Sequence, residues 1–253
     1  MISYLTYNQD CQYAFLFYYI SYIKEHCKKG GIAAVYENGF ITIKKGEWKF
    51  RVDKVSNIPL TFGGRVTFMI SNVLAATLAT YAYGFTIEDI KMNLETFIPS
   101  AAQTPGRMNI FDFKEYKVLI DFAHNPDGFR GIKEFLSTTD SPYKIGIITG
   151  TGDRRDEDIR EMGRISAEMF DHIIIRQDKF LRGRQADDIV KLLVEGIHEH
   201  NPKQSYEYIP KEVEALKHAL SLAKPGAFIT ALSDVIDNAI DLVQSYLDKE
   251  RGL

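Results

Sequence analysis

The chain has 253 residues, and its 45% hydrophobic and 26% charged residues are ordinary proportions for a globular protein with a buried core. The formal net charge of -3 at pH 7 gives no net attraction to nucleic acid or to an anionic membrane, so we expect neither as a partner. The two cysteines, Cys11 and Cys27, form no Cys-x-x-Cys pair, so we expect no disulfide framework and no zinc site, and a reducing cytoplasm fits the chain.

One segment, residues 13–23, is strongly apolar and rich in aromatic side chains. It is about half as long as the roughly 20 residues that span a bilayer. A buried helix or strand is therefore the simplest interpretation. The alternative is a surface that other protein covers.

The rest of the first hundred residues predicts a small antiparallel meander followed by two helices. Strands are expected at 32–36, 40–44 and 48–52, with Asn38-Gly39 as a tight turn between the first two. A helix is expected at 66–83, where Gly84 stops it. A second helix is expected at 86–97, with Thr86 as its N-cap and Asp89 completing a capping box.

After Pro105 short apolar strands alternate with helices. Strands are expected at 118–123, 144–149, 172–176, 205–209 and 227–232, and helices at 127–137, 156–170, 186–198, 213–223 and 235–249. This alternation is typical of an α/β fold with a mainly parallel sheet covered on both faces. Such sheets bind ligands at the carboxyl ends of their strands.

The sharpest local pattern is VLIDFAHNPDG at residues 118–128. It places Asp121 at the end of a buried strand, with His124 and Asn125 in the following loop. A carboxylate there can accept hydrogen bonds from ribose hydroxyls, and an imidazole can stack on a purine. Alternatively, Asp121 only caps the loop and His124 is a surface residue with its own partners. The ribose hypothesis requires the Asp121 carboxylate to face outward.

Several blocks of sequence resemble the Mur ligase family. PGRMNIF (105–111) and IDFAHNPDGF (120–129) resemble the junction between the central and carboxy-terminal domains of these enzymes. IPLTFGG (58–64) and ISNVLAATLATYAYG (70–84) resemble the end of the central domain. GTGDRRDEDIREMG (150–163) and IIIRQDKFLRGR (173–184) are similar more specifically to the cyanophycin synthetases of this family.

The resemblance implies a two-part α/β protein. Residues 1–103 would form a partial central domain that lacks its phosphate-loop half, and residues 104–253 a Rossmann-like carboxy-terminal domain. No Gly-x-x-Gly-Lys-Thr-type loop occurs in the 253 residues. The family's magnesium ligands also lie upstream of the matching region. A further departure is Met69, where relatives carry a second asparagine.

The family activates a carboxylate with ATP as an acyl phosphate, which an amine then attacks. By resemblance, Asn72 contacts the adenine, Asp121 holds the ribose, and His124 and Asn125 lie in the loop beside the nucleotide. Arg107 matches an arginine that reaches the ATP phosphates and is the expected catalytic residue, because it can stabilise charge on the transferred phosphoryl group. ATP and magnesium are the implied cofactors.

The cyanophycin synthetase resemblance implies two substrates, arginine and an acidic polymer of aspartate. A guanidinium group binds carboxylates, so Asp153 and Asp178 are candidates for holding arginine. The polymer favours arginines, and the candidates are Arg154, Arg155, Arg182 and Arg184. For each residue the alternative is a structural role, such as the first-turn charges at 156–158 or an Asp156–Arg160 pair on one helix.

We therefore expect the carboxy-terminal portion of an ATP-dependent amide ligase, cytoplasmic and inactive as an isolated chain. Two alternatives are a degenerate, non-catalytic binding module and a fragment of another Mur ligase or of folylpolyglutamate synthetase. Met1 could be a natural start or a truncation. The unpaired edge of an incomplete central sheet also makes a homo-oligomer possible.

Overall fold

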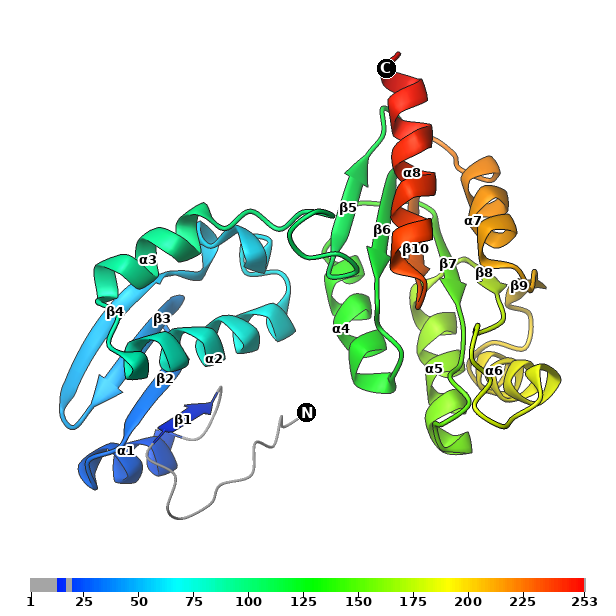
Figure 1. The fold of residues 1–253 in the computed structure, drawn as a ribbon. Coiled ribbons are helices and arrows are strands. Elements are labelled where there is room, and N and C mark those ends of the chain that lie inside the picture. The colour runs from blue at the N-terminus through cyan, green and yellow to red at the C-terminus, as the bar shows by residue number, and fades with distance from the viewer. Residues whose placement is uncertain (1–12, 17–19, 253) are drawn as a thin grey trace. The chain divides into compact units, whose positions relative to one another are not determined.

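The computed structural model describes residues 13–16 and 20–252, with side chains from Ile23 onward. The chain divides into two compact units, Met1–Ile98 and Pro99–Leu253. Each unit is built on its own sheet (Figure 1). Among the described residues, no helix has both the length and the apolar character needed to cross a membrane.

The amino-terminal unit contains a four-stranded sheet in the order β1-β2-β3-β4. Its strands are β1 (Tyr13–Leu16), β2 (Ile32–Glu37), β3 (Phe40–Lys45) and β4 (Trp48–Lys54). The meander β2-β3-β4 is antiparallel, as predicted, whereas β1 adds a parallel edge strand. The tight turn between β2 and β3 is also confirmed, since Asn38 and Gly39 both have positive φ, 53° and 81°.

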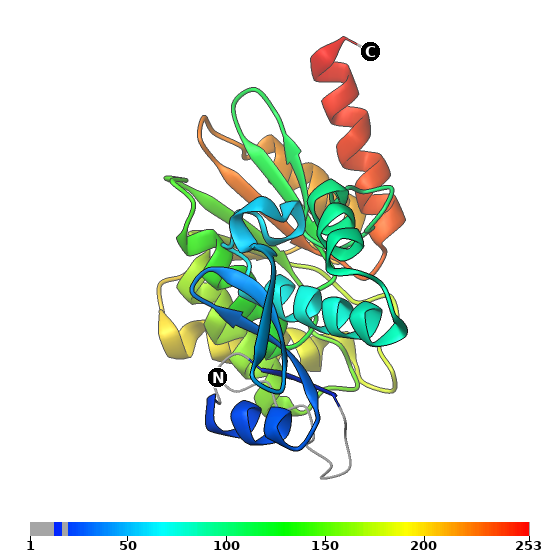
Figure 2. The same cartoon turned by 90° about the vertical axis from the view of Figure 1, so that its left-hand side faces the viewer.

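Three helices cover the two faces of this sheet. Ile32 and Ala34 of β2 pack in one core with α2 (Thr67–Tyr83) and α3 (Ile87–Thr96), which lie side by side in Figure 2. Ala33 and Val35 point the other way and pack against α1 (Ile20–Lys28). The alternation follows from the period of two residues in a strand. The predicted capping box of Thr86 and Asp89 is present at the start of α3.

The carboxy-terminal unit contains a six-stranded sheet in the order β5-β6-β10-β7-β8-β9. Its strands are β5 (Asn109–Asp112), β6 (Lys117–Asp121), β7 (Lys144–Ile148), β8 (His172–Ile175), β9 (Ser205–Tyr208) and β10 (Phe228–Leu232). All neighbouring pairs are parallel except β5 with β6. The predicted mainly parallel α/β sheet is therefore confirmed. Strand β5 was not among the strands predicted from the sequence.

Five helices cover this sheet on both faces (Figure 1). They are α4 (Pro126–Ser137), α5 (Asp156–Met169), α6 (Ala186–His200), α7 (Glu212–Ser221) and α8 (Ile236–Arg251). The helices α7 and α8 pack on one face, in a core with Val118 and Ile120 of β6. The other face carries α4, whose Phe135 contacts Phe228 of β10, and α5 and α6 extend that layer.

The carboxyl ends of β6, β10, β7 and β8 meet at one edge of this sheet because the four strands are parallel neighbours. Polar segments leave the strands there: Asp121, then Ser233-Asp234, then residues 149–152, then residues 176–178. We call this the carboxyl edge. It is the place where ligands bind in sheets of this kind.

Candidate active site

Asp121 fastens the loop before β5 to the end of β6. Its Oδ2 accepts a hydrogen bond from the Met108 backbone N–H at 2.8 Å, and its Oδ1 accepts one from Ala123 at 2.8 Å. Gly106 makes the loop possible, because its φ is +69° and a Cβ there would lie 2.7 Å from Ile236. The result is a closed corner in which a buried carboxylate satisfies one buried and one half-buried backbone donor.

The Asp121 side chain therefore faces inward. The residue is 5% exposed. Burial raises the pKa of this carboxyl, while the two backbone donors, then Arg107 and His124, lower it without cancelling the effect. Both oxygens already hold a hydrogen bond within the chain. A contact with ribose stays a prediction, and any such contact would use the remaining lone pairs of these two oxygens.

Arg107 and His124 both contact the ring of Phe122. The guanidinium carbon of Arg107 lies 5.1 Å from the centre of the Phe122 ring, and the His124 ring contacts it edge-on at 4.8 Å. His124 also bonds the Phe122 carbonyl through Nδ1 at 2.9 Å. Arg107 is exposed and His124 half-buried. The structure thus brings two predicted residues together through Phe122, which the sequence reading did not single out.

Asn125 and Asn72 both hold local hydrogen bonds. Asn125 is the N-cap of α4, and its Oδ1 accepts from the Gly128 N–H at 2.8 Å. Asn72 lies in the amino-terminal unit, where it is exposed on α2 and its Nδ2 is 3.7 Å from the sulfur of Met69. Capping explains Asn125 structurally. Nucleotide contacts by these two residues stay predictions.

Arg184 holds together the loops that follow β7 and β8. Its guanidinium donates to the Gly152 carbonyl at 3.0 Å, to the Arg154 carbonyl at 2.8 Å and to Asp156 at 2.6 Å. Gly152 permits this approach, since a Cβ there would lie 1.9 Å from the Leu181 carbonyl oxygen. We call residues 150–156 and 178–184, joined in this way, the clasp.

Two of the other arginines predicted to bind substrate are paired with acids in or next to the clasp. Arg182 forms an exposed ion pair with Asp153, and Arg155 forms one with Asp158 at 2.9 Å. Arg154 is half-buried, and its Nε has no hydrogen-bond partner among the described residues. Of the four predicted arginines, Arg154 is therefore the one with a buried donor left to offer. The substrate contacts of all these residues stay predictions.

A buried charge cluster that the sequence reading largely missed lies at the ends of β8 and β10. Arg176 follows β8, has a side chain that is 1% exposed, and pairs with Asp234 after β10. Its guanidinium also donates to the Leu232 carbonyl at 3.2 Å and lies 3.8 Å from Glu212 at the start of α7. Asp178, predicted as a substrate residue, belongs to this group. We call Arg176, Asp178, Glu212 and Asp234 the acid cluster.

Burial and neighbouring charges set the pKa values of its three acids. Burial raises the pKa of Asp178, and the adjacent Asp234 adds to that rise. Burial raises the pKa of Glu212 as well, although Arg176 opposes it. For Asp234 burial acts in the same direction and is the largest single cause, but the attraction of Arg176 and the hydrogen bonds with Asp178 and Arg176 together outweigh it, so the pKa lies below its ordinary value. At neutral pH, Asp234 is thus the acid that most firmly keeps its charge.

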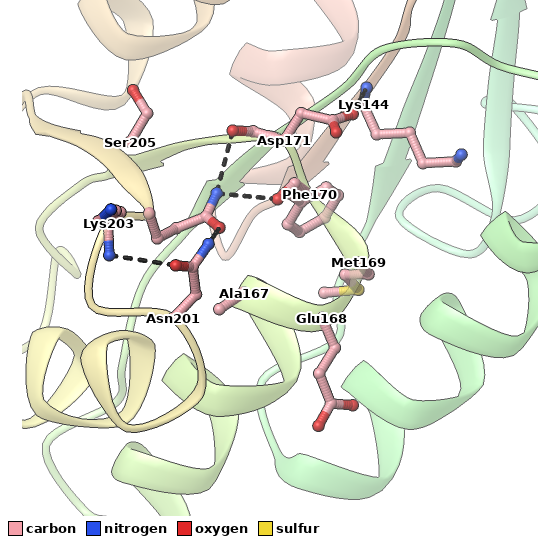
Figure 3. Close-up of a pocket in the computed structure, with 10 residues that line it drawn as sticks. Lys144, Ala167, Glu168, Met169, Phe170, Asp171, Asn201, Lys203 and Ser205 are labelled. Carbon is pink, nitrogen blue, oxygen red and sulfur yellow. Dashed lines mark hydrogen bonds between the residues drawn. The ribbon is translucent and has the colours of Figure 1, made fainter.

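A hollow lies at the opposite edge of the sheet (Figure 3). Its volume is about 520 Å³ and its lining is mainly polar. Gln204 bridges it by donating to the carbonyls of Phe170 at 2.9 Å and Asp171 at 3.0 Å. None of the predicted site residues lines it. Within residues 23–252, no group of three or more His, Cys, Asp or Glu side chains has the arrangement of a metal site.

Comparison with known proteins decides the family. The family described as "Mur ligase, glutamate ligase domain" matches residues 106–234. The chain belongs to the Mur ligase family. The match begins at the Gly106 corner and ends at Asp234 of the acid cluster, so it spans the whole carboxyl edge of this Mur ligase domain. The family consists of ATP-dependent amide ligases.

The individual Mur ligases that this chain resembles include cyanophycin synthetases. The chain is 40% identical over 252 residues to cyanophycin synthetase from Trichormus variabilis, covering 100% of this chain and 26% of that protein. It is 31% identical to UDP-N-acetylmuramyl-tripeptide synthetase from Treponema denticola, over 68% of this chain and 32% of that protein. The chain therefore spans about a quarter of the length of the first of these relatives.

The fold agrees with solved Mur ligase structures. E. coli FolC in complex with DHPP and ADP superposes with a TM-score of 0.60 at 15% identity, covering 85% of this chain and 46% of that one. At this identity the likeness establishes the fold alone. It places the six-stranded sheet and its helices among Mur ligase folds.

Proposed function

We propose that the chain is the carboxy-terminal portion of a cyanophycin synthetase-like ligase, which joins arginine to the aspartate side chains of a polyaspartate backbone. The observation that carries this proposal is the 40% identity to a cyanophycin synthetase through the whole chain, which includes both loops of the clasp. The lower identity to a peptidoglycan ligase, 31% over 68% of the chain, weighs against that substrate class. ATP supply and a charged polymer product both fit a cytoplasmic location.

In this proposal Arg107 acts on the phosphates. Its guanidinium is exposed at the carboxyl edge and lies over Phe122, which orients it. A guanidinium of this kind stabilises the charge that develops on a transferred phosphoryl group. His124, which also contacts Phe122, would lie beside the base. Asp121 contributes chiefly by fixing the loop that carries Arg107.

Magnesium does not fit the residues described here. Residues 23–252 hold no cluster of three potential ligands, and the sequence has no Gly-x-x-Gly-Lys-Thr-type loop. ATP turnover needs both a metal and a grip on the phosphates. We therefore expect these 253 residues alone to bind nucleotide at most, without hydrolysing it. We also expect that an unpaired edge strand of the β1–β4 sheet can pair with a second copy of the chain, which would give a homo-oligomer.

The direct test is nucleotide binding to the purified chain, measured by calorimetry with ADP. We expect Arg107→Ala to weaken binding by about tenfold, as for loss of one charge-assisted contact. Arg251→Ala is the control, because Arg251 is exposed at the end of α8, outside the family match. Equal affinity of the two variants would refute the role of Arg107. Robust ATP-dependent phosphate release from the chain alone would refute the expectation that these 253 residues cannot hydrolyse nucleotide by themselves.

The inward position of Asp121 favours a second candidate, a non-catalytic binding module. Both of its oxygens hold backbone donors, and Met69 replaces a polar family residue. A module of this kind would bind a partner but no nucleotide. Complete absence of ADP binding, with a normally folded chain, would support it over the ligase.

A further inference from the structure

Four polar side chains contact one another at the edge of the carboxy-terminal sheet that lies opposite the carboxyl edge. His172 begins β8, Ser205 begins β9, and the two residues are direct partners in the parallel ladder. Glu207 lies two residues further along β9, so its side chain leaves the strand on the same face as that of Ser205. His218 comes from α7. We call Ser205, His172, Glu207 and His218 the serine cluster.

The imidazole of His172 lies between a hydroxyl and a carboxylate. Its Nδ1 is 2.8 Å from Oγ of Ser205, and its Nε2 is 2.9 Å from Oε1 of Glu207. Nε2 is buried and has no aligned hydrogen bond among the described residues, so its contact with Glu207 is electrostatic. A negative charge beside Nε2 favours the ring proton on that nitrogen. Nδ1 is then the acceptor for the proton of the Ser205 hydroxyl.

Glu207 is held in its charged form by two imidazoles. Nε2 of His218 lies 3.2 Å and 3.1 Å from the two carboxylate oxygens of Glu207. The hydrogen bond with His218, and then the charges of His218 and His172, lower the pKa of the Glu207 carboxyl, although a partial loss of hydration opposes them. Glu207 is therefore ionised at neutral pH and stabilises a positive charge on His172.

The base of the serine cluster is shielded, whereas its hydroxyl is accessible. His172 is 7% exposed, but Ser205 is exposed and lines the hollow of about 520 Å³ (Figure 3). A hydroxyl within hydrogen-bond reach of a base that a third group orients is the arrangement that activates a serine as a nucleophile. The hollow also falls within the range of about 300–1,000 Å³ that is usual for small-molecule sites.

The lining of the hollow supplies positive charge. Lys144 and Lys203 both belong to it. Its two acids already have partners, because Glu168 forms ion pairs with two basic side chains and Asp171 accepts from the Lys144 backbone N–H at 2.7 Å. Positive charge at this place favours the oxyanion that forms when a hydroxyl attacks a carbonyl carbon.

We propose that Ser205 is the nucleophile and His172 the general base of a hydrolytic site, which cleaves esters of small, polar carboxylic acids. Glu207 and His218 are positioning residues. In the first step the Ser205 oxygen bonds to the carbonyl carbon, its proton moves to Nδ1 of His172, and the alcohol leaves with that proton. In the second step water attacks the acyl-serine, His172 transfers a proton from that water to the Ser205 oxygen, and the acid is released. The site is independent of nucleotide binding at the carboxyl edge.

The first test is labelling of the purified 253-residue chain with a fluorophosphonate, which forms a stable phosphonyl ester with an activated serine as fluoride leaves. Mass spectrometry of peptides should find the label on Ser205. His172→Gln should slow labelling about a hundredfold, the lower end of what a positioned general base contributes. Ser245 is the internal control, because it is exposed on α8 and its hydroxyl donates to a backbone carbonyl. Equal labelling of Ser245 and Ser205, or undiminished labelling in His172→Gln, would overturn the proposal.

The second test is hydrolysis of p-nitrophenyl acetate by the same chain. Ser205→Ala should lower the release of p-nitrophenol at least about tenfold, because only background reaction with other side chains remains. Ser245→Ala should leave the release unchanged. Equal rates in Ser205→Ala and the wild-type chain would refute the proposal.

The pH profile of that release tests Glu207 without replacing a buried residue. In Glu207→Gln the imidazole of His172 loses a neighbouring negative charge, so it deprotonates more readily and the pH of half-maximal rate should move down. His218 and Tyr143 also face Glu207, and neither reverses this sign. An unchanged pH profile would contradict the role of Glu207 and with it the assigned cluster.

Discussion

Asp121 and Asp178 are two buried aspartates at the same edge of one sheet, but they differ in the hydrogen-bond donors that surround their carboxylates. Asp121 is 5% exposed and Asp178 is 3% exposed, and burial raises the pKa of both. Asp121 has a backbone donor on each oxygen. Asp178 has a donor on one oxygen only, and a second acid lies beside it.

The difference distinguishes a buried carboxylate that stabilises the fold from one that is available to a ligand. A fully satisfied carboxylate stabilises the fold and has little left to offer a ligand. A buried carboxylate without a donor costs stability, and such a cost is often found where a ligand completes the arrangement. The same substitution, aspartate to asparagine, should therefore have effects of opposite sign at the two positions.

The largest effect is expected for Asp121→Asn. An asparagine offers one acceptor oxygen in place of two, so its NH₂ group faces a buried backbone N–H. We expect a loss of about 2–4 kcal/mol in the free energy of unfolding, as for an unsatisfied buried donor next to another donor. Urea denaturation followed by circular dichroism measures it. A variant as stable as the wild-type chain would show that the closed corner does not stabilise the fold.

A smaller loss in the free energy of unfolding is expected when the hydrogen bonds that join the two loops of the clasp are removed. Arg184→Ala removes three hydrogen bonds from a side chain that is 28% exposed, and we expect a loss of about 1–3 kcal/mol. Arg182→Ala is the matched control in the same loop, because its ion pair with Asp153 is 46% and 47% exposed. Such surface pairs typically contribute about 0–1 kcal/mol. Equal losses in the two variants, again by urea denaturation, would contradict the special role of Arg184.

The smallest expected change in stability is that of Asp178→Asn, and it is a gain rather than a loss. In Asp178→Asn the amide can donate to Asp234, so one like-charge contact becomes a hydrogen bond. We expect a gain of about 1 kcal/mol in the free energy of unfolding at pH 7. Destabilisation comparable with that of Asp121→Asn would remove the contrast between the two acids.

The pH dependence of this gain provides an internal check. The raised pKa of Asp178 means that the folded chain binds its proton more tightly than the unfolded chain does. The resulting stability is fully present below the ordinary aspartate pKa of about 3.9 and is lost as the pH rises through the raised value. The gain in Asp178→Asn should therefore widen with rising pH. Urea denaturation at a series of pH values measures this trend.

Much of the fold could be predicted from the sequence because its elements are local and periodic. The strands and helices after Pro105 lie within about two residues of their predicted ends, apart from β5. That four-residue strand was missed because it is too short for a periodic signal and depends on pairing with β6. The apolar run at 13–23 holds β1 and the start of α1, with residues 17–19 outside the described part.

The site was predictable in position but not in orientation. The motif around Asp121 correctly placed polar residues at the carboxyl edge. Its inward turn depends on the Met108 N–H, which a loop 13 residues earlier brings to it. The acid cluster could not be assembled from sequence because Arg176 and Asp234 lie on separate strands. One signal was available: Arg176 and Asp178 directly follow the fully buried strand β8, where charged side chains are rare unless paired.

The three hydrogen bonds of Arg184 also bear on how a substrate would be captured. Two loops that would otherwise fluctuate independently are tied into one preorganised surface before any ligand arrives. Ordering flexible loops ordinarily consumes part of the free energy of association. A substrate that docks here should therefore lose little affinity to loop ordering, and its exchange should be fast rather than gated by closure of a lid.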